Sequence, residues 1–398
     1  MTSGAVLCYN ADMLQSTYDV AVIGTGSFGA WTAWHLRRSG QSVLLLDAWG
    51  PGHSRSSSGG ESRAIRMGYG GDEIYTRMSM RSLVLWQDLF RQTGEPLFHR
   101  TGVLLMARPG DPYSEATERT LAAAGVPMEI VPGAEIGRRY PQMRLSDPKV
   151  YGIFEPQSGA LMARRAVALV VEDAARQGAV YATEAVLAPS GSGPRASVRT
   201  TSGQAIRAGT FVFACGPWLP KIFPSLLGAR IYPTRQEVFF LAPPAGDRRF
   251  APPEMPVWID FTDHRGPYGF PDLEGRGLKL AFDRHGPAFD PDTGDRRLSA
   301  SGLEEAYRFL AERFPDLAEA PLVESRVCQY ENSSNGDFLI DRHPAFDNVW
   351  LAGGGSGHGF KHGPAVGEYL SAQILRGGVA EPRFSLESKL HTKQRTVY

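Results

Sequence analysis

The stretch YDVAVIGTGSFGAWTAWHLRRSGQSVLLLD, residues 18–47, decides the fold of this chain. It begins with a β-branched apolar run over residues 18–24, which predicts a buried strand. Residues 28–38 have the composition of a helix, and Gly40 is suited to end it. A second apolar run follows over residues 42–47, so the stretch predicts a strand–helix–strand unit.

Three glycines lie at the turn between the first strand and the helix. Gly24, Gly26 and Gly29 match the GxGxxG pattern, and Asp47 ends the second strand 21 residues after Gly26. The glycines allow a tight turn, close approach of a pyrophosphate and close packing of helix and strand, while Asp47 can accept from a ribose hydroxyl. The pattern predicts dinucleotide binding, and the alternative is a tight turn that binds no ligand.

The fingerprint fits both NAD and FAD, and the far end of the chain favours FAD. A glycine-rich loop, GGSGHGFK over residues 354–361, follows a predicted strand over 348–352. It precedes a predicted helix over 363–375 that Pro364 opens. Such a loop can place a second helix N-terminus against a flavin, for which an NAD-binding domain has no evident use.

The remaining sequence predicts scaffold elements around these motifs. The Gly/Ser-rich residues 50–60 predict a loop ordered by a bound ligand rather than a floppy linker. Apolar periodicity predicts a helix from Tyr75 to Gly94 and another over residues 163–177. A second parallel-sheet segment is predicted from strand-like runs over residues 179–181, 197–201 and 210–215.

The stretch 231–295 differs in composition from the rest of the chain. It is rich in aromatic residues, Pro and Gly, which favours an antiparallel sheet that covers the substrate. Ser301 and Glu304 form a capping-box pattern that predicts the start of a helix. The predicted division is an N-terminal extension, 1–17; a cofactor domain, 18–95, 150–225 and 325–398; and a substrate domain, 96–149 and 226–324.

Composition excludes several classes of protein. Lys plus Arg and Asp plus Glu number 42 each among 398 residues, so there is no electrostatic signature of nucleic-acid binding. No apolar run reaches the ~20 residues of a membrane-spanning helix. Three cysteines, Cys8, Cys215 and Cys328, support neither a disulfide framework nor a zinc site, so we expect no metal and a reducing cytoplasm.

Several motifs in one order resemble the amine oxidases of the D-amino acid oxidase type, and within them the monomeric sarcosine oxidase and pipecolate oxidase branch. They are TGSFGAW at 25–31, SSSGGESRAIRMGYG at 56–70, RTGVLLM at 100–106, FEPQSGALM at 154–162, YGFPDLEGRGLKLAFD at 268–283, VCQYENSSNGDFLIDRHP at 327–344 and GSGHGFKHGPAVGE at 355–368. The resemblance implies a mixed α/β fold, with a Rossmann-type FAD domain assembled from distant segments and an antiparallel-sheet substrate domain. It also implies oxidation of the C–N bond of a secondary or N-methylated amino acid, with oxygen reduced to hydrogen peroxide.

The resemblance also implies roles for individual residues. Cys328 corresponds to the cysteine that bonds covalently to the flavin, whereas Cys215 is expected to be a core residue at the cofactor. Lys279 corresponds to the lysine that activates oxygen, because an ammonium stabilises the negative charge that develops there. Arg63 corresponds to an arginine near the flavin. The predicted catalytic residues are Lys279, Arg63, His358 and Asp283.

Cations and one tyrosine are expected to hold the substrate. Arg66 and Lys361 correspond to the pair that binds the substrate carboxylate, and Tyr268 corresponds to a tyrosine of the pocket. Asp283 departs from the family, which has a histidine there, and Arg265 adds a nearby cation. Asp283 could hold an amino group or a basic side chain, and Arg265 could pair with Asp283 or bind a second carboxylate, as in iminodiacetate.

The predicted cofactor contacts come from both glycine motifs and the segments around them. They are Gly24, Gly26, Ser27, Phe28, Gly29, Asp47, Ser54, Ser57, Ser58, Arg63, Val186, Cys215, Gly216, Trp218, Cys328, Gly355, Gly357, His358, Gly359, Phe360 and Lys361.

The expected reaction removes a hydride equivalent from the carbon beside a free-base amine and gives an imine that water hydrolyses. The alternatives are a dehydrogenase that passes electrons to a quinone or carrier, an oxidase of a cyclic imino acid or iminodiacetate, an idle FAD-binding subunit, and an NAD-dependent dehydrogenase. The expected partners are a small amino acid and oxygen, with no nucleic acid and no membrane, in a monomer or small homo-oligomer.

Overall fold

The computed structural model describes residues 16–145 and 147–393, and its chain divides into two compact units. The first unit contains the residues up to Gly60, residues 163–233 and the residues from Tyr330 onward. The second unit contains residues 61–162 and 234–329. Cys8 lies outside the described residues. No described helix combines the length and apolarity needed to cross a membrane.

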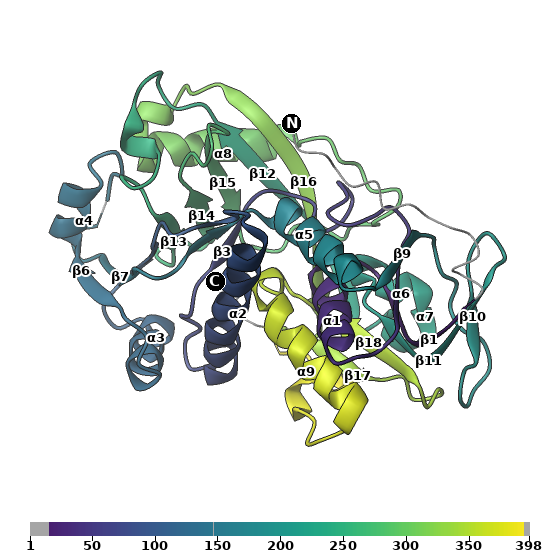
Figure 1. Cartoon of the computed structure of the whole chain (residues 1–398). Helices are drawn as coiled ribbons and strands as arrows, with labels where there is room; N and C mark the ends of the chain where they lie inside the picture. Colours follow the sequence, from purple (N-terminus) through teal and green to yellow (C-terminus); the bar gives the residue numbers. More distant parts are fainter. Residues whose placement is uncertain (1–15, 146, 394–398) are drawn as a thin grey trace. The chain divides into compact units, whose positions relative to one another are not determined.

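The first unit is built on a mainly parallel sheet (Figure 1). Its strand order is β17-β18-β11-β1-β2-β9, with β10 paired to β11. The bounds are β1 Thr17–Ile23, β2 Val43–Asp47, β9 Val180–Thr183, β10 Ser197–Arg199, β11 Ala205–Phe213, β17 Leu339–Arg342 and β18 Val349–Gly353. The predicted strand–helix–strand unit is confirmed, because β1 and β2 are parallel and α1, Ser27–Arg38, connects them. β10 is antiparallel to β11, so the prediction of a parallel strand over 197–201 is wrong.

Helices cover this sheet through close contacts at glycines. α1 packs against α5, Ala163–Arg176, and α9, Gly363–Arg376; the short helices are α6, Leu219–Ile222, and α7, Pro224–Leu227. A Cβ atom on Gly367 would lie 2.5 Å from the backbone of Trp31, so only glycine allows α1 and α9 to approach this closely.

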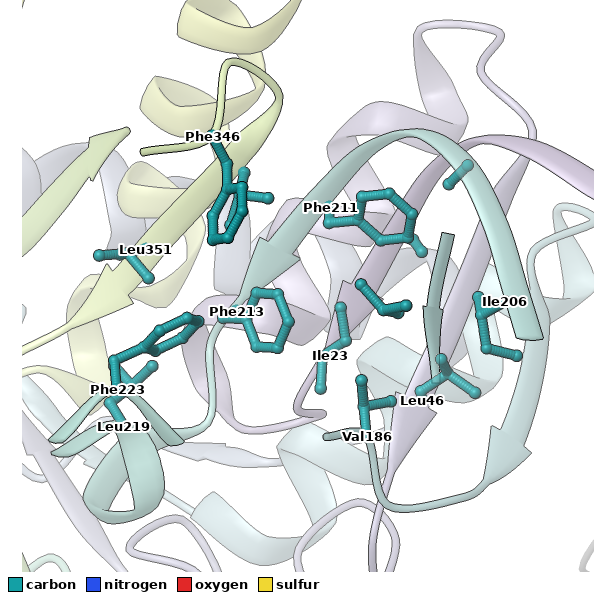
Figure 2. Packing of buried hydrophobic residues seen from close by; sticks show 14 of the residues in the cluster. Ile23, Leu46, Val186, Ile206, Phe211, Phe213, Leu219, Phe223, Phe346 and Leu351 are labelled. Carbon is teal, nitrogen blue, oxygen red and sulfur yellow. The ribbon is translucent and has the colours of Figure 1, made fainter. Parts of the chain in front are cut away.

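The core of the first unit lies along β1, β11 and β18 (Figure 2). Figure 2 shows Phe211, Phe213, Phe223 and Leu351 among the side chains of this cluster. Phe211 and Phe213 are fully buried, and replacing either with alanine would cost roughly 3–5 kcal/mol. The core therefore joins strands that lie far apart in the sequence.

The second unit contains an eight-stranded sheet in the order β16-β12-β15-β14-β13-β5-β7-β6. The bounds are β5 Val103–Ala107, β6 Glu129–Pro132, β7 Tyr151–Glu155, β12 Ile231–Leu241, β13 Val257–Asp260, β14 Pro267–Phe270, β15 Leu278–Phe282 and β16 Leu322–Ser333. The antiparallel prediction for 231–295 is confirmed for β12, β15, β14 and β13. β13 also pairs with β5 in parallel, which the local sequence did not indicate.

Helix α8, Ala300–Arg313, contributes Phe309 and other side chains to the core of this sheet. Phe309 stacks on Trp258 with ring centroids 5.8 Å apart. The helix begins two residues earlier than the capping-box pattern predicted, because Ser299, and not Ser301, caps it by accepting from Gly302 N–H at 3.0 Å. The other helices of the second unit are α2 Glu73–Thr93, α3 Pro112–Ala123 and α4 Gly133–Arg139.

A three-stranded sheet explains why the predicted division differs from the compact units. Strand β8, Gly159–Leu161, pairs with β3, Arg63–Ile65, and with β4, Phe98–His99. This pairing joins parts of 61–95 and 150–162, which the sequence analysis had grouped with the cofactor domain, to the second unit.

Candidate functional site

Gly24, Gly26 and Gly29 form the turn between β1 and α1, which we call the cofactor cradle. Side chains at Gly24 and Gly29 would clash with the neighbouring backbone. Gly24 has φ +103°, and a Cβ atom there would lie 2.3 Å from the carbonyl oxygen of Ala214. A Cβ atom on Gly29 would lie 1.9 Å from the carbonyl oxygen of Gly24, whereas the nearest atom to one on Gly26 would be Ser58 Oγ at 3.8 Å. Gly26 is the N-cap of α1, and no side chain caps it. The space beside Gly26 and the N–H groups of the first turn of α1, among them Ser27 N–H, which donates to Ser58 Oγ at 3.4 Å, suit a pyrophosphate.

Asp47 lies at the end of β2, beside this turn. Its Oδ2 accepts hydrogen bonds from the N–H and hydroxyl of Thr25 at 2.8 and 2.9 Å. Its Oδ1 accepts from the N–H groups of Trp49 and Gly50, both at 2.9 Å. The carboxylate therefore fixes the turn, and rotation of the Thr25 hydroxyl would leave room for one ribose hydroxyl.

The C-terminal glycine loop lies beside the same turn. Ser27 Oγ donates to the carbonyl oxygen of Phe360 at 2.7 Å, and a Cβ atom on Gly359 would lie 3.1 Å from the Phe28 ring. Gly357 has φ +80°, and a Cβ atom there would lie 2.8 Å from the Tyr330 ring. The structure therefore brings the two predicted glycine motifs together, although more than 300 residues separate them.

Two predicted residues of this loop are buried. The His358 ring stacks on Phe338 with centroids 4.9 Å apart and an interplanar angle of 22°. Lys361 lies in a short 3-10 turn before α9, and its Nζ is 3.5 Å from the carbonyl oxygen of His358. The stacking fixes the imidazole, and the Lys361 ammonium lies close to the backbone of the same loop.

The other predicted cofactor residues line the ends of the same strands. Cys215 donates from Sγ to the carbonyl oxygen of Ile23 at 3.4 Å, and burial raises the pKa of its thiol far above the usual range. Trp218 packs on Trp49 with ring centroids 4.7 Å apart. Val186 belongs to the core cluster, and Ser54 and Ser57 lie in the turn-rich segment 50–60 predicted as a loop. Cys215 is half-buried and packs against the core cluster, and its raised pKa disfavours the thiolate.

Glu331 is a residue of this site that the sequence analysis missed. Its carboxylate accepts hydrogen bonds from the N–H groups of Gly354 and Gly355, and burial raises its pKa to about 7. A Cβ atom on Gly353 would lie 2.3 Å from its Oε1, so any other residue there would have to displace the carboxylate. The available signal was an acidic residue in the otherwise buried end of β16.

A group of cations surrounds Cys328 in the second unit. Cys328 lies on β16, is 5% exposed, and packs with Val238, Phe240 and Ala281. Arg63 Nη2 lies 3.6 Å from its Sγ. Burial raises the pKa of the thiol, but Arg63, Arg326 and Lys279 outweigh that effect and bring it below the usual value. The thiolate, which is the reactive form of cysteine, therefore forms more easily here than in an ordinary thiol.

Lys279 lies on β15 and is 2% exposed. Its Nζ donates to the carbonyl oxygen of Ser62 at 2.6 Å and lies 4.3 Å from the centroid of the Phe270 ring. Burial, together with the charge of Arg63, holds the pKa of Lys279 well below its usual value. Negative charge that develops beside Lys279 would stabilise its charged form.

Arg66 follows β3 and is 3% exposed. Its guanidinium carbon lies 4.7 Å from the centroid of the Tyr69 ring. Burial opposes its charge, whereas Tyr113, Tyr69 and Glu155 favour it, and the pKa of the guanidinium is raised.

Glu155, which the sequence analysis missed, fixes the backbone that follows Arg66. It accepts from the N–H groups of Met67 and Gly68 at 2.7 and 2.9 Å and from Ser158 Oγ at 2.6 Å. The only signal for it was its place within the FEPQSGALM motif.

Arg265 engages two acidic residues of the second unit, Asp263 and Glu312. Arg265 forms two-pronged hydrogen bonds to Asp263 and a further ion pair with Glu312 at 3.2 Å. Its guanidinium carbon also lies 5.4 Å from the centroid of the Phe309 ring. Asp283 lies just after β15, where its N–H donates to the carbonyl oxygen of Gly266 at 2.8 Å. Arg265 is thereby engaged in structural contacts within the second unit.

Tyr268 lies on β14, opposite Ala281 of β15. It packs against the same cluster as Cys328 and meets the Phe270 ring edge to face at 6.3 Å. The second unit thus brings together Tyr268, Lys279, Arg63 and Cys328, all of which were predicted site residues.

The comparisons with known proteins agree with this geometry. Residues 19–373 match the DAO family of FAD-dependent oxidoreductases. The chain is 33% identical over 377 residues to a monomeric sarcosine oxidase of Streptomyces avermitilis, which covers 93% of this chain and 96% of the relative. It is 30% identical to human peroxisomal sarcosine oxidase, over 89% of this chain and 91% of the relative.

Solved structures share the fold at lower identity. An L-proline dehydrogenase from P. horikoshii has a TM-score of 0.79 at 21% identity, over 93% of this chain and 97% of that one. The amino acid oxidase NikD has a TM-score of 0.76 at 22% identity, over 95% and 98%. The fold is therefore the predicted one, with a Rossmann-type unit assembled from distant segments and a second unit built on a largely antiparallel sheet. From the extent of the family match and the identity to the sarcosine oxidases, this chain belongs to the DAO family of FAD-dependent oxidoreductases.

Proposed function

We propose that this protein oxidises the C–N bond of a secondary or N-substituted amino acid to an imine and passes the electrons to oxygen, which gives hydrogen peroxide. The observation that carries the proposal is the buried cluster of Cys328, Arg63 and Lys279, in a chain whose relatives include sarcosine oxidases. When bound, FAD accepts two electrons from the substrate and returns them to oxygen.

The first unit supplies the residues that would hold FAD. The cradle of Gly24, Gly26 and Gly29 and the N-terminus of α1 suit the pyrophosphate, and Asp47 suits the ribose. The loop from Gly355 to Phe360 supplies further backbone contacts. Cys328 would form the covalent bond to the flavin ring, because the cations around it favour the thiolate.

The substrate carboxylate is assigned to Arg66 and Lys361 on the basis of the family resemblance. Both side chains are buried cations, and a guanidinium fork together with an ammonium suits one carboxylate. Tyr268 would contribute an apolar wall near the amine. Removing water from the amine lowers its pKa, and the free base has the lone pair that the reaction needs.

Lys279 is assigned to oxygen activation. Its charge would stabilise the negative charge that oxygen acquires, and its neighbour Arg63, another of the predicted catalytic residues, supports the assignment. We also propose that the protein is located in the reducing cytoplasm, because Cys215 and Cys328 are both free thiols.

A substrate panel tests the proposal. The purified protein is mixed with sarcosine, N-methyl amino acids, L-proline, pipecolate and iminodiacetate, and both anaerobic flavin bleaching and peroxide release are measured. Bleaching together with peroxide release supports an oxidase. Bleaching that reverses only with a quinone or dye identifies a dehydrogenase, and a yellow protein that no amine bleaches contradicts the proposed reaction.

A further inference from the structure

Glu331 is a buried acid in the part of β16 that belongs to the first unit. Its side chain accepts from the N–H groups of Gly354 and Gly355, but among the described residues no group forms a hydrogen bond with its buried Oε1. A Cβ atom on Gly353 would lie 2.3 Å from Oε1 and 2.4 Å from Leu219 Cδ1, so this oxygen lies on an apolar side of the site. A negative charge is costly in such a place, whereas a protonated carboxyl is not.

Glu331 lies close to the cofactor cradle. A Cβ atom on Gly24 would lie 3.2 Å from Cys215 N, and a Cβ atom on Gly216 would lie 4.0 Å from Glu331 Oε2. The two neighbouring residues Cys215 and Gly216 therefore connect the cofactor cradle to the carboxyl group. This separation is comparable with the ~8 Å over which charges interact at physiological salt, and burial weakens the screening further.

The other ionisable groups near Glu331 come from β2, β11 and the C-terminal glycine loop. Burial, Asp47 and Glu331 raise the pKa of the Cys215 thiol far above its usual range, so this thiol stays neutral. The Asp47 carboxylate is held by Thr25 and the turn that follows β2. His358 and Lys361 follow Gly355 in the glycine loop. The pKa of Glu331 is nevertheless raised to about 7, because burial outweighs the hydrogen bonds from the loop.

FAD would add negative charge next to this acid. Its diphosphate carries two negative charges, which the N-terminus of α1 favours. An ionised Glu331 would be a further negative charge at the same edge of the sheet. A nearby like charge disfavours the ionised form of a carboxyl group, so the diphosphate and the Glu331 carboxylate oppose each other.

We propose that Glu331 takes up one proton from the solvent when FAD binds, so that the protein binds FAD more tightly at mildly acidic than at mildly alkaline pH. The charges balance, because the carboxylate and the solvent proton give a neutral carboxyl and FAD keeps both its charges. The inference rests on FAD binding in the first unit. It goes beyond the proposed reaction, which requires no ionisable group at this position.

A titration with FAD tests the proposal. It uses FAD-free Cys328→Ser protein, because a covalent bond would hide dissociation, and follows flavin fluorescence at pH 6.5 and pH 8.5. FAD has no group that titrates between these pH values. Linkage to one proton changes a dissociation constant by at most about tenfold per pH unit, so we expect roughly a five- to twentyfold higher dissociation constant at pH 8.5.

Two further substitutions in the Cys328→Ser protein identify the group responsible. Glu331→Gln preserves the size of the side chain but does not titrate, so its dissociation constant should be the same at both pH values. Glu184→Gln is the matched control: Glu184 follows β9, at the far edge of the same sheet, and accepts from Ser202 Oγ at 3.1 Å. It should retain the pH dependence. Equal dissociation constants in Cys328→Ser at both pH values, or an unchanged pH dependence with Glu331→Gln, overturn the inference.

Infrared spectroscopy tests the FAD-loaded protein itself. At pH 8, the difference spectrum between wild type and Glu331→Gln should contain the carbonyl band of a protonated carboxylic acid. A carboxylate band in its place overturns the inference, whether or not the FAD-free variants fold.

The inference and the proposed reaction fail in different ways. FAD binding that does not depend on pH, in a protein that releases peroxide with an amine, overturns only the role of Glu331. Binding that depends on pH through Glu331, in a yellow protein that no amine bleaches, supports the role of Glu331 and contradicts the proposed reaction.

Discussion

Arg63 Nη2 lies 3.6 Å from the sulfur of Cys328, inside a cluster that also contains Lys279. A buried thiol normally resists ionisation, but here the cations lower its pKa. Cys215 shows the opposite behaviour, because burial dominates and raises its pKa. The pKa values of the two thiols of the described residues are therefore shifted in opposite directions.

We predict that FAD is bound covalently through Cys328. After acid precipitation, the yellow colour and the flavin mass should remain with the protein. Cys328→Ser should release them into the supernatant, whereas Cys215→Ser, the matched control, should retain them. Protein-bound flavin in denatured Cys328→Ser would show that another residue forms the bond.

Loss of the cation at Lys279 should slow the reaction with oxygen. We expect Lys279→Met to lower the reoxidation rate by ~10²–10³, the usual cost of removing one electrostatic donor, because charge develops on oxygen and not on the amine. Anaerobic reduction by the substrate should change much less. Stopped-flow absorbance measures both steps, and equal losses in the two steps would contradict the assignment.

The lowered pKa of Lys279 gives a pH dependence with a definite sign. Lysine is charged below its pKa, so reoxidation should be fast at low pH and slow as the pH rises through the lowered pKa, well before the usual 10.5. The Lys279→Met variant should lack this alkaline decline. If the reoxidation rate declines equally at alkaline pH in wild type and Lys279→Met, a group other than Lys279 causes the decline.

The carboxylate site can be tested with a simple carboxylate inhibitor. A hydrogen bond to a charged group contributes ~1.5–3 kcal/mol, so Arg66→Ala should raise the apparent dissociation constant roughly ten- to hundredfold. Lys361→Ala should act in the same direction. Arg265→Ala is the control, because Asp263 and Glu312 already engage that guanidinium. The inhibitor is titrated and its binding is followed by flavin absorbance. A loss of affinity in Arg265→Ala alone would assign the carboxylate site to Arg265 instead of Arg66 and Lys361.

Glu331 should make stability depend on pH. Its pKa is raised from 4.5 to about 7, so the folded protein holds a proton that the unfolded chain releases. This contribution is complete below about pH 4.5 and is lost as the pH rises to about 7, with a total of roughly 3 kcal/mol. Glutamine does not titrate, so Glu331→Gln should not lose this contribution. Its free energy of unfolding should therefore rise relative to that of wild type as the pH increases from about 4.5 to about 7. The free energies of unfolding of wild type and Glu331→Gln are measured at pH 5 and pH 8. If the difference between the two proteins is the same at both pH values, the prediction is wrong.

Local patterns predicted the parts of the fold that depend on neighbouring residues. The glycine fingerprint, α1 and both flanking strands follow from the alternation and spacing in residues 18–47. Pro364 and Gly94 mark the start of α9 and the end of α2 for equally local reasons. The helix cap at Ser299 was displaced because Glu237, far away in the sequence, also binds Ser299 and fixes the chain there.

Long-range pairing explains what the sequence could not supply. β13 pairs in parallel with β5, about 150 residues earlier, and no local signal indicates that partner. Glu331 and Glu155 act by accepting backbone N–H groups of remote segments, so their roles are visible only in three dimensions. The sequence predicted that Arg265 contacts the substrate, and it could not show that the Arg265 guanidinium also pairs with Asp263 and Glu312.

The contact of α1 with α9 has a consequence for synthesis on the ribosome. Trp31 is fully buried, and Gly363 and Gly367 cover it from a segment made more than 300 residues later. Translation adds ~5–20 residues per second, so the Trp31 indole is not covered by α9 for roughly 20–70 s. The cofactor cradle beside it is likewise incomplete until α9 emerges. Loading with FAD must therefore follow translation of nearly the whole chain, and apolar surface near Trp31 is the part that a chaperone would need to shield in the meantime.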